Sequence, residues 1–329
     1  MLNLGYQVTL AGEGNVAALF KKEFPDTRII PLAGYKISYS KKGIFFIPKI
    51  LLQVPKIIRA ISKEHQWLDQ QLSIHHWDLI ISDNRYGLYT PRTKTVFISH
   101  QLGVISGFGK WGDAITRLLL YRWVNRFNTC WIPDCAGRTN IAGKLSHPKS
   151  MPNHYQFIGP LSRLKNTATS EGSHVLVLLS GPEPQRTMLE NILINQLGQI
   201  NEAVIFVRGL PSSAPPISDR DNIHFENHLD GDAISALVSG AKAVVCRSGY
   251  SSVMDLLKLG KRALLIPTPG QTEQVYLARH LHKMKWFLVQ DQEKLDLKKD
   301  LMALIAQSFE LPTLDFESFK KAFSDLGIQ

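Results

Sequence analysis

The chain has 329 residues, of which 44% are hydrophobic and 20% are charged, as in a soluble protein with two domains. Its net charge of +10 favours an anionic partner, but no apolar run approaches the roughly 20 residues of a membrane span. No nucleic-acid-binding motif accompanies the charge, so we expect no nucleic acid as partner. The three cysteines form neither a disulfide framework nor a zinc pattern, which favours the reducing cytoplasm.

The first half of the chain is predicted to hold five strands and three helices. Its first five residues, MLNLG, are typical of the last turn of a helix that ends at Gly5. A doubly wound domain ordinarily opens on a strand, so we expect a strand and a glycine-rich turn upstream of Met1 and a first domain that lacks its first strand. The predicted strands are residues 7–11, 79–82, 96–99, 130–132 and 156–158, and the predicted helices are residues 16–23, 48–72 and 111–127.

A small, polar linker at residues 159–174 leads into a more regular second half. Apolar strands alternate with helices there, which is typical of a parallel sheet covered on both faces. We therefore predict an α/β protein with one domain over residues 1–158 and another over residues 159–314. The predicted strands of the second domain are residues 175–179, 203–207, 223–225, 243–246, 263–267 and 287–289, and its predicted helices are residues 185–197, 232–240, 253–259 and 273–281.

The segment CRSGYSSVMD, residues 246–255, joins a predicted strand to a predicted helix. A glycine turn at the head of a helix presents free backbone N–H groups and the positive end of the helix dipole, which suits a phosphate. Gly249 lets a ligand approach the backbone, Arg247 adds a charge, and Asp255 offers a carboxylate to the diol of a ribose. Hydroxyl donors follow at Ser248, Ser251 and Ser252. Ordinary helix capping by one of the last two serines, and a surface aspartate favoured by the dipole, explain the pattern equally well.

Two further corners lie where predicted strands end. Ser180 and Gly181 follow residues 175–179, and Gln271, Glu273 and Gln274 stand at the head of a helix that follows residues 263–267. Amides and carboxylates there are suited to sugar hydroxyls, although ordinary helix-start chemistry explains the second corner too. A ligand beyond the carboxyl ends of the strands would touch all three corners. Neither a GxGxxG fingerprint nor a Walker sequence is present, which disfavours dinucleotides and ATP.

Residues 225–281 resemble the donor half of family 28 glycosyltransferases, which include a bacterial enzyme that adds N-acetylglucosamine to a lipid-linked sugar. The pattern is a strand followed by RSG, a helix with an acidic residue, a G-x-x-A strand ending in proline, and a helix that bears glutamine. A weaker resemblance through FIGPLSR covers most of the chain and is closest to predicted bacterial glycosyltransferases. It implies a GT-B fold, in which two Rossmann-like doubly wound domains face a cleft and a C-terminal helix, within residues 315–329, packs back on the first domain.

The resemblance carries over to the donor site residue by residue. It implies that the RSG turn and its serines face a diphosphate, and that Asp255 holds the ribose in place of a longer glutamate. It also implies that Arg163 lies near the base, that the backbone of Leu229 pairs with uracil, and that the head of the glutamine-bearing helix reads the sugar. The corner at residues 180–184 departs from the family pattern because two prolines remove N–H donors. The predicted donor-binding residues are Arg163, Ser180, Gly181, Leu229, Arg247, Ser248, Gly249, Ser251, Ser252, Asp255, Gln271, Glu273 and Gln274.

The acceptor side is harder to read from the sequence. The family's glycine-rich loop ending in histidine has no counterpart in this chain. An inverting transfer needs a base for the acceptor hydroxyl, and His100 and Asp83 follow two predicted strands, although a structural role in the turn explains His100 as well. The resemblance implies a reaction without a metal ion or other cofactor.

Two basic amphipathic segments suggest a role for the positive charge of the chain. Residues 47–59 and 111–127 place apolar side chains at helical spacing among lysines and arginines, among them Arg117, Arg122 and Arg126. Such helices suit the surface of an anionic membrane, and burial of both stripes in the domain core is the alternative.

We therefore expect a metal-independent bacterial glycosyltransferase of the cytoplasm, in peripheral contact with the cytoplasmic face of the membrane. It would move a hexosyl or N-acetylhexosaminyl group from a UDP-sugar to a lipid-linked or cell-envelope acceptor. Two alternatives stay open: an enzyme like the UDP-sugar 2-epimerases, and a non-catalytic subunit or truncated chain that binds UDP-sugars.

Overall fold

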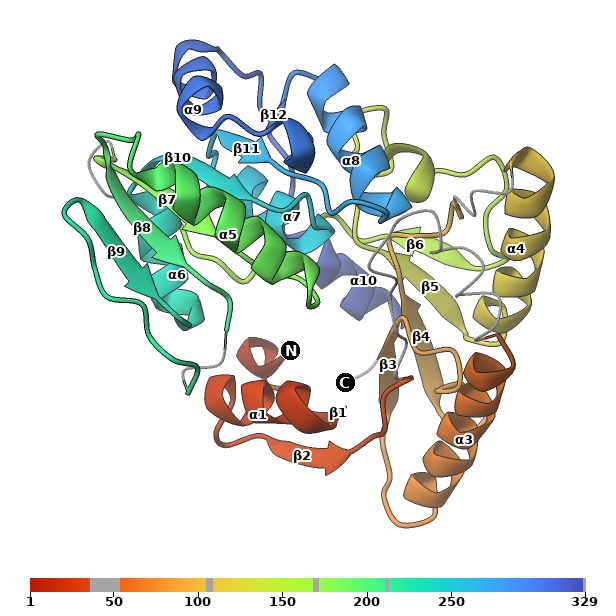
Figure 1. The fold of residues 1–329 in the computed structure, drawn as a ribbon. Helices are drawn as coiled ribbons and strands as arrows, with labels where there is room; N and C mark the ends of the chain where they lie inside the picture. Colours follow the sequence, from red (N-terminus) through yellow and green to blue (C-terminus); the bar gives the residue numbers. More distant parts are fainter. Residues whose placement is uncertain (36–53, 105–108, 168–171, 211–212, 328–329) are drawn as a thin grey trace.

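The computed structural model describes residues 1–329 except 36–53, 105–108, 168–171, 211–212 and 328–329 (Figure 1). The described residues form parallel sheets of two, four and six strands, with helices against them (Figure 1). The two smaller sheets belong to the first half of the chain and the largest sheet to the second half. None of the helices in the described segments is both long enough and apolar enough to cross a membrane.

The six-stranded sheet has the order β12-β11-β10-β7-β8-β9, and all its neighbouring strands run parallel. The order reverses between β7 and β10, and the carboxyl ends of strands at such a switch point leave a crevice for a ligand. The strands are β7 (His174–Leu178), β8 (Ala203–Val207), β9 (Ile223–Glu226), β10 (Ala241–Cys246), β11 (Ala263–Leu265) and β12 (Leu288–Val289). The helices around them are α5 (Gln185–Leu197), α6 (Gly231–Ser239), α7 (Tyr250–Lys258), α8 (Thr272–Lys283) and α9 (Leu297–Ala306).

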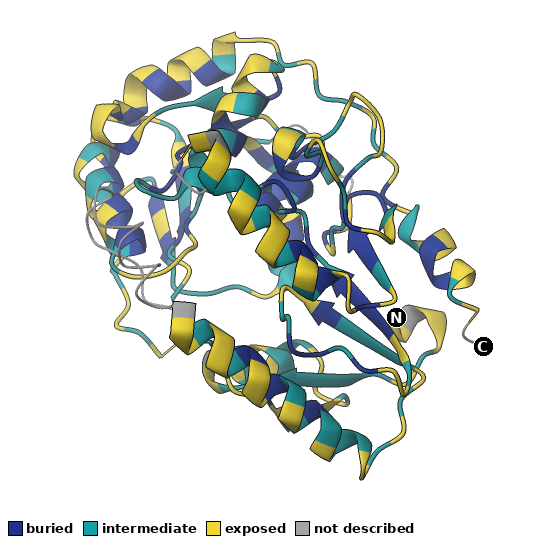
Figure 2. Cartoon of the chain, turned by 90° about the vertical axis from the view of Figure 1, so that its right-hand side faces the viewer, coloured by how far each residue is buried: buried dark blue, intermediate teal, exposed yellow. Residues whose placement is uncertain are grey.

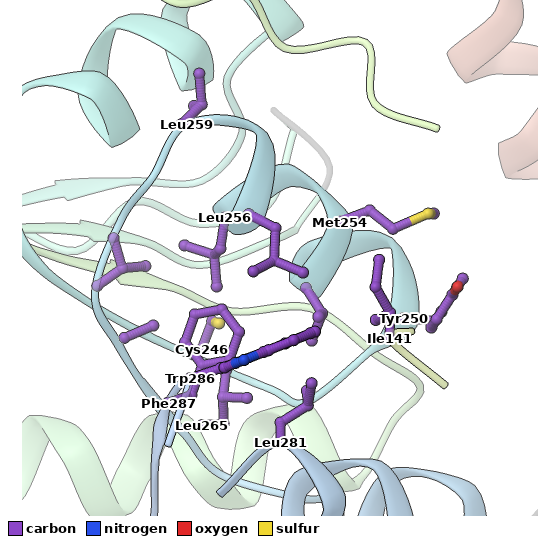
Figure 3. Close-up of a cluster of buried hydrophobic side chains, with 14 of the residues drawn as sticks. Ile141, Cys246, Tyr250, Met254, Leu256, Leu259, Leu265, Leu281, Trp286 and Phe287 are labelled. Atoms are coloured by element: carbon purple, nitrogen blue, oxygen red, sulfur yellow. The ribbon is translucent and has the colours of Figure 1, made fainter. Parts of the chain in front are cut away.

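Both faces of this sheet are buried, because side chains of successive residues in a strand point to opposite faces. Along β10, Val244 and Cys246 belong to a hydrophobic cluster with residues of α6, α7 and α8. Ala243 and Val245 belong to a second cluster, with residues of α5 and α9. Figure 3 shows the first cluster, in which Cys246 lies among residues of α7 and α8 and near Trp286. A continuous apolar strand is what such two-sided burial requires.

The first half is divided between two sheets. The four-stranded sheet has the order β3-β4-β5-β6, whereas β1 pairs only with β2 among the described residues. The two sheets are built from β1 (Thr9–Gly12), β2 (Arg28–Pro31), β3 (Leu79–Asp83), β4 (Lys94–Ile98), β5 (Thr129–Ile132) and β6 (Tyr155–Phe157). Their helices are α1 (Gly14–Glu23), α3 (Val54–Leu72) and α4 (Gly109–Val124).

The C-terminal helix α10 (Phe319–Asp325) lies against the four-stranded sheet. Its Phe323 meets the ring of Trp131 edge-on at 4.8 Å and shares a cluster with Val96. Phe97, the next residue of β4, points to the opposite face, where it clusters with α4 residues such as Val124. The chain end therefore covers one face of this sheet while α4 covers the other.

Most of the predicted elements are confirmed, with ends that move by a few residues. Leu2–Leu4 form a 3-10 helix that ends at Gly5, whose φ of 82° places it in the left-handed region. Two elements were not predicted: β2, a short strand that ends in proline, and α9. Strand β1 does not join the four-stranded sheet, and residues 48–53 of the predicted second helix lie outside the described residues. The upstream strand and the domain boundary after residue 158 stay predictions; β6 ends at Phe157 and β7 begins at His174.

Candidate functional site

The corner between β10 and α7 lies at the switch point of the six-stranded sheet. Gly249 is the N-cap residue of α7, in an extended conformation and without a side-chain cap. Ser251 and Ser252 lie inside the first turn, so the prediction that one of them caps the helix is wrong. No hydrogen bond of a described residue satisfies the N–H groups of Tyr250, Ser251 and Ser252. These N–H groups, with the positive end of the helix dipole, are suited to an anion.

Two residues of the same corner face inward and support it. The Ser248 side chain is fully buried, and its hydroxyl donates to the Gln274 carbonyl at 3.0 Å. Arg247 is also buried, and burial lowers its pKa to about 10. Its guanidinium donates to the carbonyls of Ile266, Pro267 and Gln185 and to the Gln292 side chain. We predicted that Arg247 binds the donor; instead, its side chain fixes the loops behind the corner, because those carbonyls need a donor in the interior.

Asp255 lies one turn further along α7 and is half-buried. Its Oδ1 accepts a hydrogen bond of 2.6 Å from the Ser162 hydroxyl, while Oδ2 has no partner among the described residues. Burial raises the pKa of Asp255, and the Ser162 hydrogen bond and the charge of Arg163 oppose the rise. A carboxylate held at one oxygen can offer the other oxygen to a ligand hydroxyl.

Arg163, which follows Ser162 in the linker, extends its side chain toward the start of α6. A Cβ placed on Gly231 would lie 3.6 Å from the guanidinium carbon of Arg163, so the guanidinium covers this glycine. Leu229 lies two residues before Gly231 and is half-buried. Arg163 also forms an ion pair with Glu23 of α1. The structure thus brings Arg163 and Leu229 into one neighbourhood, on the same side of α7 as Asp255.

The head of α8 carries three predicted sugar-reading residues in different settings. Gln271 is the N-cap residue and is half-buried. The Gln274 Oε1 accepts from the Thr268 N–H at 3.0 Å, which leaves its NH₂ group for a ligand. Glu273 reaches across to the first half of the chain, where its Oε1 lies 2.8 Å from His100 Nε2.

His100 is therefore held by the other half of the molecule. Besides its contact with Glu273, its ring stacks on Tyr250 with centroids 4.0 Å apart and planes 5° apart. Tyr250, in turn, donates its hydroxyl hydrogen to the Pro133 carbonyl at 2.7 Å. We did not predict a role for Tyr250, whose place beside the RSG turn was the available signal. Both partners of the His100 ring lie far along the chain, 150 and 173 positions away.

Asp83 ends β3 with an exposed side chain, and Asn84 follows with a φ of 53°. Desolvation raises the pKa of Asp83, and the charge of His100 opposes the rise. His100 and Asp83, predicted separately, are thus close enough to interact electrostatically.

A buried carboxylate supports the corner after β3, and sequence reasoning missed it. Glu64 of α3 accepts hydrogen bonds from Tyr35 Oη at 2.5 Å, from the Gly87 N–H at 3.1 Å and from Arg85. Burial, followed by this carboxylate, raises the pKa of the Tyr35 hydroxyl. The signal was an acidic residue on the apolar stripe of α3, between Ile61 and Leu68.

The corner between β7 and α5 is open to solvent. Ser180 and Gly181 are exposed, and Gly181 has a φ of 110°. Helix α5 has no side-chain cap at its N-cap residue, Pro184. Since β7 neighbours β10 in the sheet, this corner lies beside Gly249, as the sequence predicts. Within the described segments, no group of three His, Cys, Asp or Glu side chains is placed to hold a metal ion.

Comparison with known proteins finds a family model that matches part of the chain. Residues 222–326 match the model of the "Glycosyltransferase family 28 C-terminal domain". No curated protein matches the chain in sequence.

Solved structures share the whole fold. The glycosyltransferase SnogD from Streptomyces nogalater matches with a TM-score of 0.61 and 11% identity, over 99% of this chain and 88% of that chain. Arabidopsis thaliana UGT89C1 complexed with UDP-L-rhamnose matches with a TM-score of 0.58 and 13% identity, over 99% of this chain and 87% of that chain. The glycosyltransferase VinC in complex with DTDP matches with a TM-score of 0.55 and 14% identity, over 99% of this chain and 88% of that chain. At such identities the likeness shows the fold alone.

The predicted GT-B fold is therefore confirmed, with a family 28 domain that contains the β10–α7 corner, Asp255 and the head of α8. The chain thus has the GT-B fold, and its residues 222–326 are similar to the C-terminal domain of family 28 glycosyltransferases.

Proposed function

We propose that this glycosyltransferase moves a hexosyl or N-acetylhexosaminyl group from a UDP-sugar to a lipid-linked or cell-envelope acceptor. The observation that carries the donor assignment is the β10–α7 corner, where uncapped N–H groups stand one helical turn from a carboxylate with a free oxygen. The first feature suits the diphosphate and the second suits the ribose of a nucleoside diphosphate. Two of the structural neighbours hold such ligands, DTDP and UDP-L-rhamnose.

In the proposed complex, the diphosphate lies at the start of α7 and next to Ser180 and Gly181. The helix dipole and the N–H groups would stabilise the negative charge that develops on the leaving UDP, and we propose that no metal ion is needed. The sugar would then extend toward Gln271, the NH₂ group of Gln274, and Glu273.

We propose His100 as the base. If Nε2–H donates to Glu273 Oε1, the basic lone pair stands on Nδ1, as in other sites where a carboxylate fixes a histidine tautomer. The acceptor hydroxyl oxygen would attack the anomeric carbon while its proton passes to His100 and the bond to the diphosphate breaks. Asp83 is the second candidate, because its raised pKa brings it closer to a useful range. The base would be complete only when both halves of the molecule are together.

The acceptor is proposed to be lipid-linked because of the outer side of α4. Trp111, Ile115, Leu118 and Leu119 repeat at helical spacing and are exposed, Trp111 by 85% and Leu118 by 73%. The expectation that this stripe forms domain core fails for these four residues. Figure 2 faces the side of α3 and α4, where both helices carry exposed residues along their outer surfaces.

Basic side chains flank the α4 stripe. Arg122 and Arg126 are exposed and Arg117 is half-buried. Apolar side chains among arginines on an amphipathic helix suit the surface of an anionic membrane. We propose that this face makes peripheral contact with the membrane that carries the acceptor. Of the corresponding segment, residues 47–59, the part 47–53 lies outside the described residues, and Ile58 in the rest is 46% exposed.

The donor proposal is tested by thermal unfolding of the intact chain with and without UDP. Preferential binding to the folded state raises the melting temperature, so UDP should raise it and the Asp255→Ala variant should lose that rise. A parallel measurement with EDTA should leave the rise unchanged. If UDP has no effect on the wild-type chain while another nucleotide does, the donor assignment is wrong.

Turnover separates the remaining alternatives. A transferase releases UDP from a UDP-sugar faster when acceptor is added, whereas an epimerase converts the sugar without acceptor. A subunit that only binds would show the thermal shift and neither reaction.

A further inference from the structure

Glu23, the last residue of α1, lies at the nucleoside end of the proposed donor site although it belongs to the other half of the chain. Its Oε2 is 2.9 Å from Arg163 Nη1. The Arg163 guanidinium covers Gly231 at the start of α6. Arg163 directly follows Ser162, which binds Asp255. Glu23 therefore extends a line of polar side chains that runs from Asp255 through the linker to the first half of the chain.

The two oxygens of the Glu23 carboxylate differ in their surroundings. Oε2 has its ion pair, whereas Oε1 is buried and has no hydrogen-bond partner among the described residues. The side chain as a whole is only 15% exposed. A buried polar atom without a partner is destabilising, so a ligand that donates a hydrogen bond to Oε1 would relieve a cost already present in the free protein.

The chemistry of the carboxylate limits what that ligand group can be. An ionised carboxylate only accepts hydrogen bonds, so its partner must carry an N–H or an O–H. The diphosphate of a nucleotide offers neither and repels a second negative charge. The uridine moiety offers both, through the N–H of its base and the hydroxyls of its ribose.

We propose that Glu23 is a donor-binding residue, with Oε1 accepting a hydrogen bond from the uridine moiety while Oε2 holds Arg163 in place. This inference rests on the proposed function and deepens it, because the nucleoside site then spans both halves of the molecule. Helix α1 must be docked against the second half for the nucleoside to be fully bound, whereas the diphosphate site at α7 belongs to the second half alone.

The experiment compares two ligands on three proteins by calorimetry: the wild type, Glu23→Gln, and Asp26→Asn as control. In the variant, the amide oxygen would turn to Arg163 and the NH₂ group would face the uridine donor, so the UDP affinity should fall about tenfold. Inorganic pyrophosphate, measured directly or as a competitor of UDP, should bind as to the wild type. Asp26 is exposed three residues further on, and Asp26→Asn makes the same change of charge, so it should alter neither affinity.

A second variant guards against misfolding. Glu23→Asp keeps the charge but shortens the side chain by one methylene. It should therefore also lower the affinity for UDP and leave the affinity for pyrophosphate unchanged. Unchanged UDP affinity in a folded variant overturns the inference, and so does an equal loss for both ligands, which would indicate a purely structural role. If the wild type itself fails to bind UDP, the proposed function has failed, which is a different result.

Discussion

The two halves of the molecule hold their candidate site residues in different ways. In the second half, one continuous six-stranded sheet is buried on both faces, and its corners present backbone N–H groups at a switch point. In the first half, the strands are divided between two sheets, and the corner after β3 depends on a buried side chain, Glu64. His100 depends on side chains of the other half. Backbone geometry thus forms the proposed donor site, whereas tertiary contacts of side chains position the candidate catalytic residues.

This difference predicts that changes in the two halves separate cleanly in their effects. Substitutions at His100 or Glu64 should reduce transfer or stability and leave UDP binding nearly intact. Substitutions at the β10–α7 corner should weaken UDP binding and, with it, transfer. Glu23 is the expected exception, because it is in the first half and is proposed to bind the nucleoside.

The largest expected effect is that of His100→Asn. Loss of a general base lowers a reaction rate by about a hundred- to ten-thousand-fold, and transfer should fall by that amount. The UDP-induced rise in melting temperature should persist, because no proposed contact with UDP involves His100. The measurement is the steady-state rate of UDP release with acceptor. His154→Asn, at an exposed position of the first half, is the control and should keep the wild-type rate. A rate within about tenfold of the wild type would remove His100 as the base and leave Asp83 as the candidate.

Glu64→Gln should have the next largest effect, on stability. The carboxylate is 3% exposed, pairs with Arg85 and accepts from the Gly87 N–H. Removal of one partner from a buried ion pair costs roughly 3 kcal/mol of unfolding free energy, which chemical denaturation can measure. Transfer should fall as well, because the corner that carries Asp83 loses its support. An equal change at exposed Glu293 should have no effect, and a Glu64→Gln protein as stable as the wild type would contradict the role assigned to this contact.

The same contrast explains what the sequence could predict. The β10–α7 corner was predictable because its geometry follows from the order strand, glycine turn, helix, which local sequence determines. Arg247 was misassigned because the neighbouring sequence does not reveal that its side chain lies against the buried carbonyls of Ile266 and Pro267, which accept its hydrogen bonds. Tyr250 and Glu64 were missed because their partners lie far along the chain. Nothing in the sequence marked Glu23 as a site residue, since it is an ordinary last residue of a helix. Only the structure shows its ion pair with Arg163.

The first-half strands show the same limit for the fold. Strand β1 has a normal apolar run, but which strand it pairs with is not encoded locally, and it pairs with β2, which was not predicted. By contrast, every strand of the six-stranded sheet was expected, although not its exact bounds, because burial on both faces makes most of them nearly continuous apolar runs.

The smallest expected effect concerns the outer face of α4 and separates the membrane proposal from the donor site. A Trp111→Ser, Leu118→Ser double variant removes two exposed apolar side chains, so binding to vesicles rich in anionic lipid should weaken about tenfold. Stability and UDP binding should not change, because neither side chain is buried. The control is Met188→Ser, which removes a 45% exposed apolar residue from α5 in the second half. Sedimentation with vesicles measures the difference, and equal binding of the double variant and the wild type would show that α4 does not face the membrane. In that case the arginines around the stripe would carry no argument for a lipid-linked acceptor, while the donor site would be untouched.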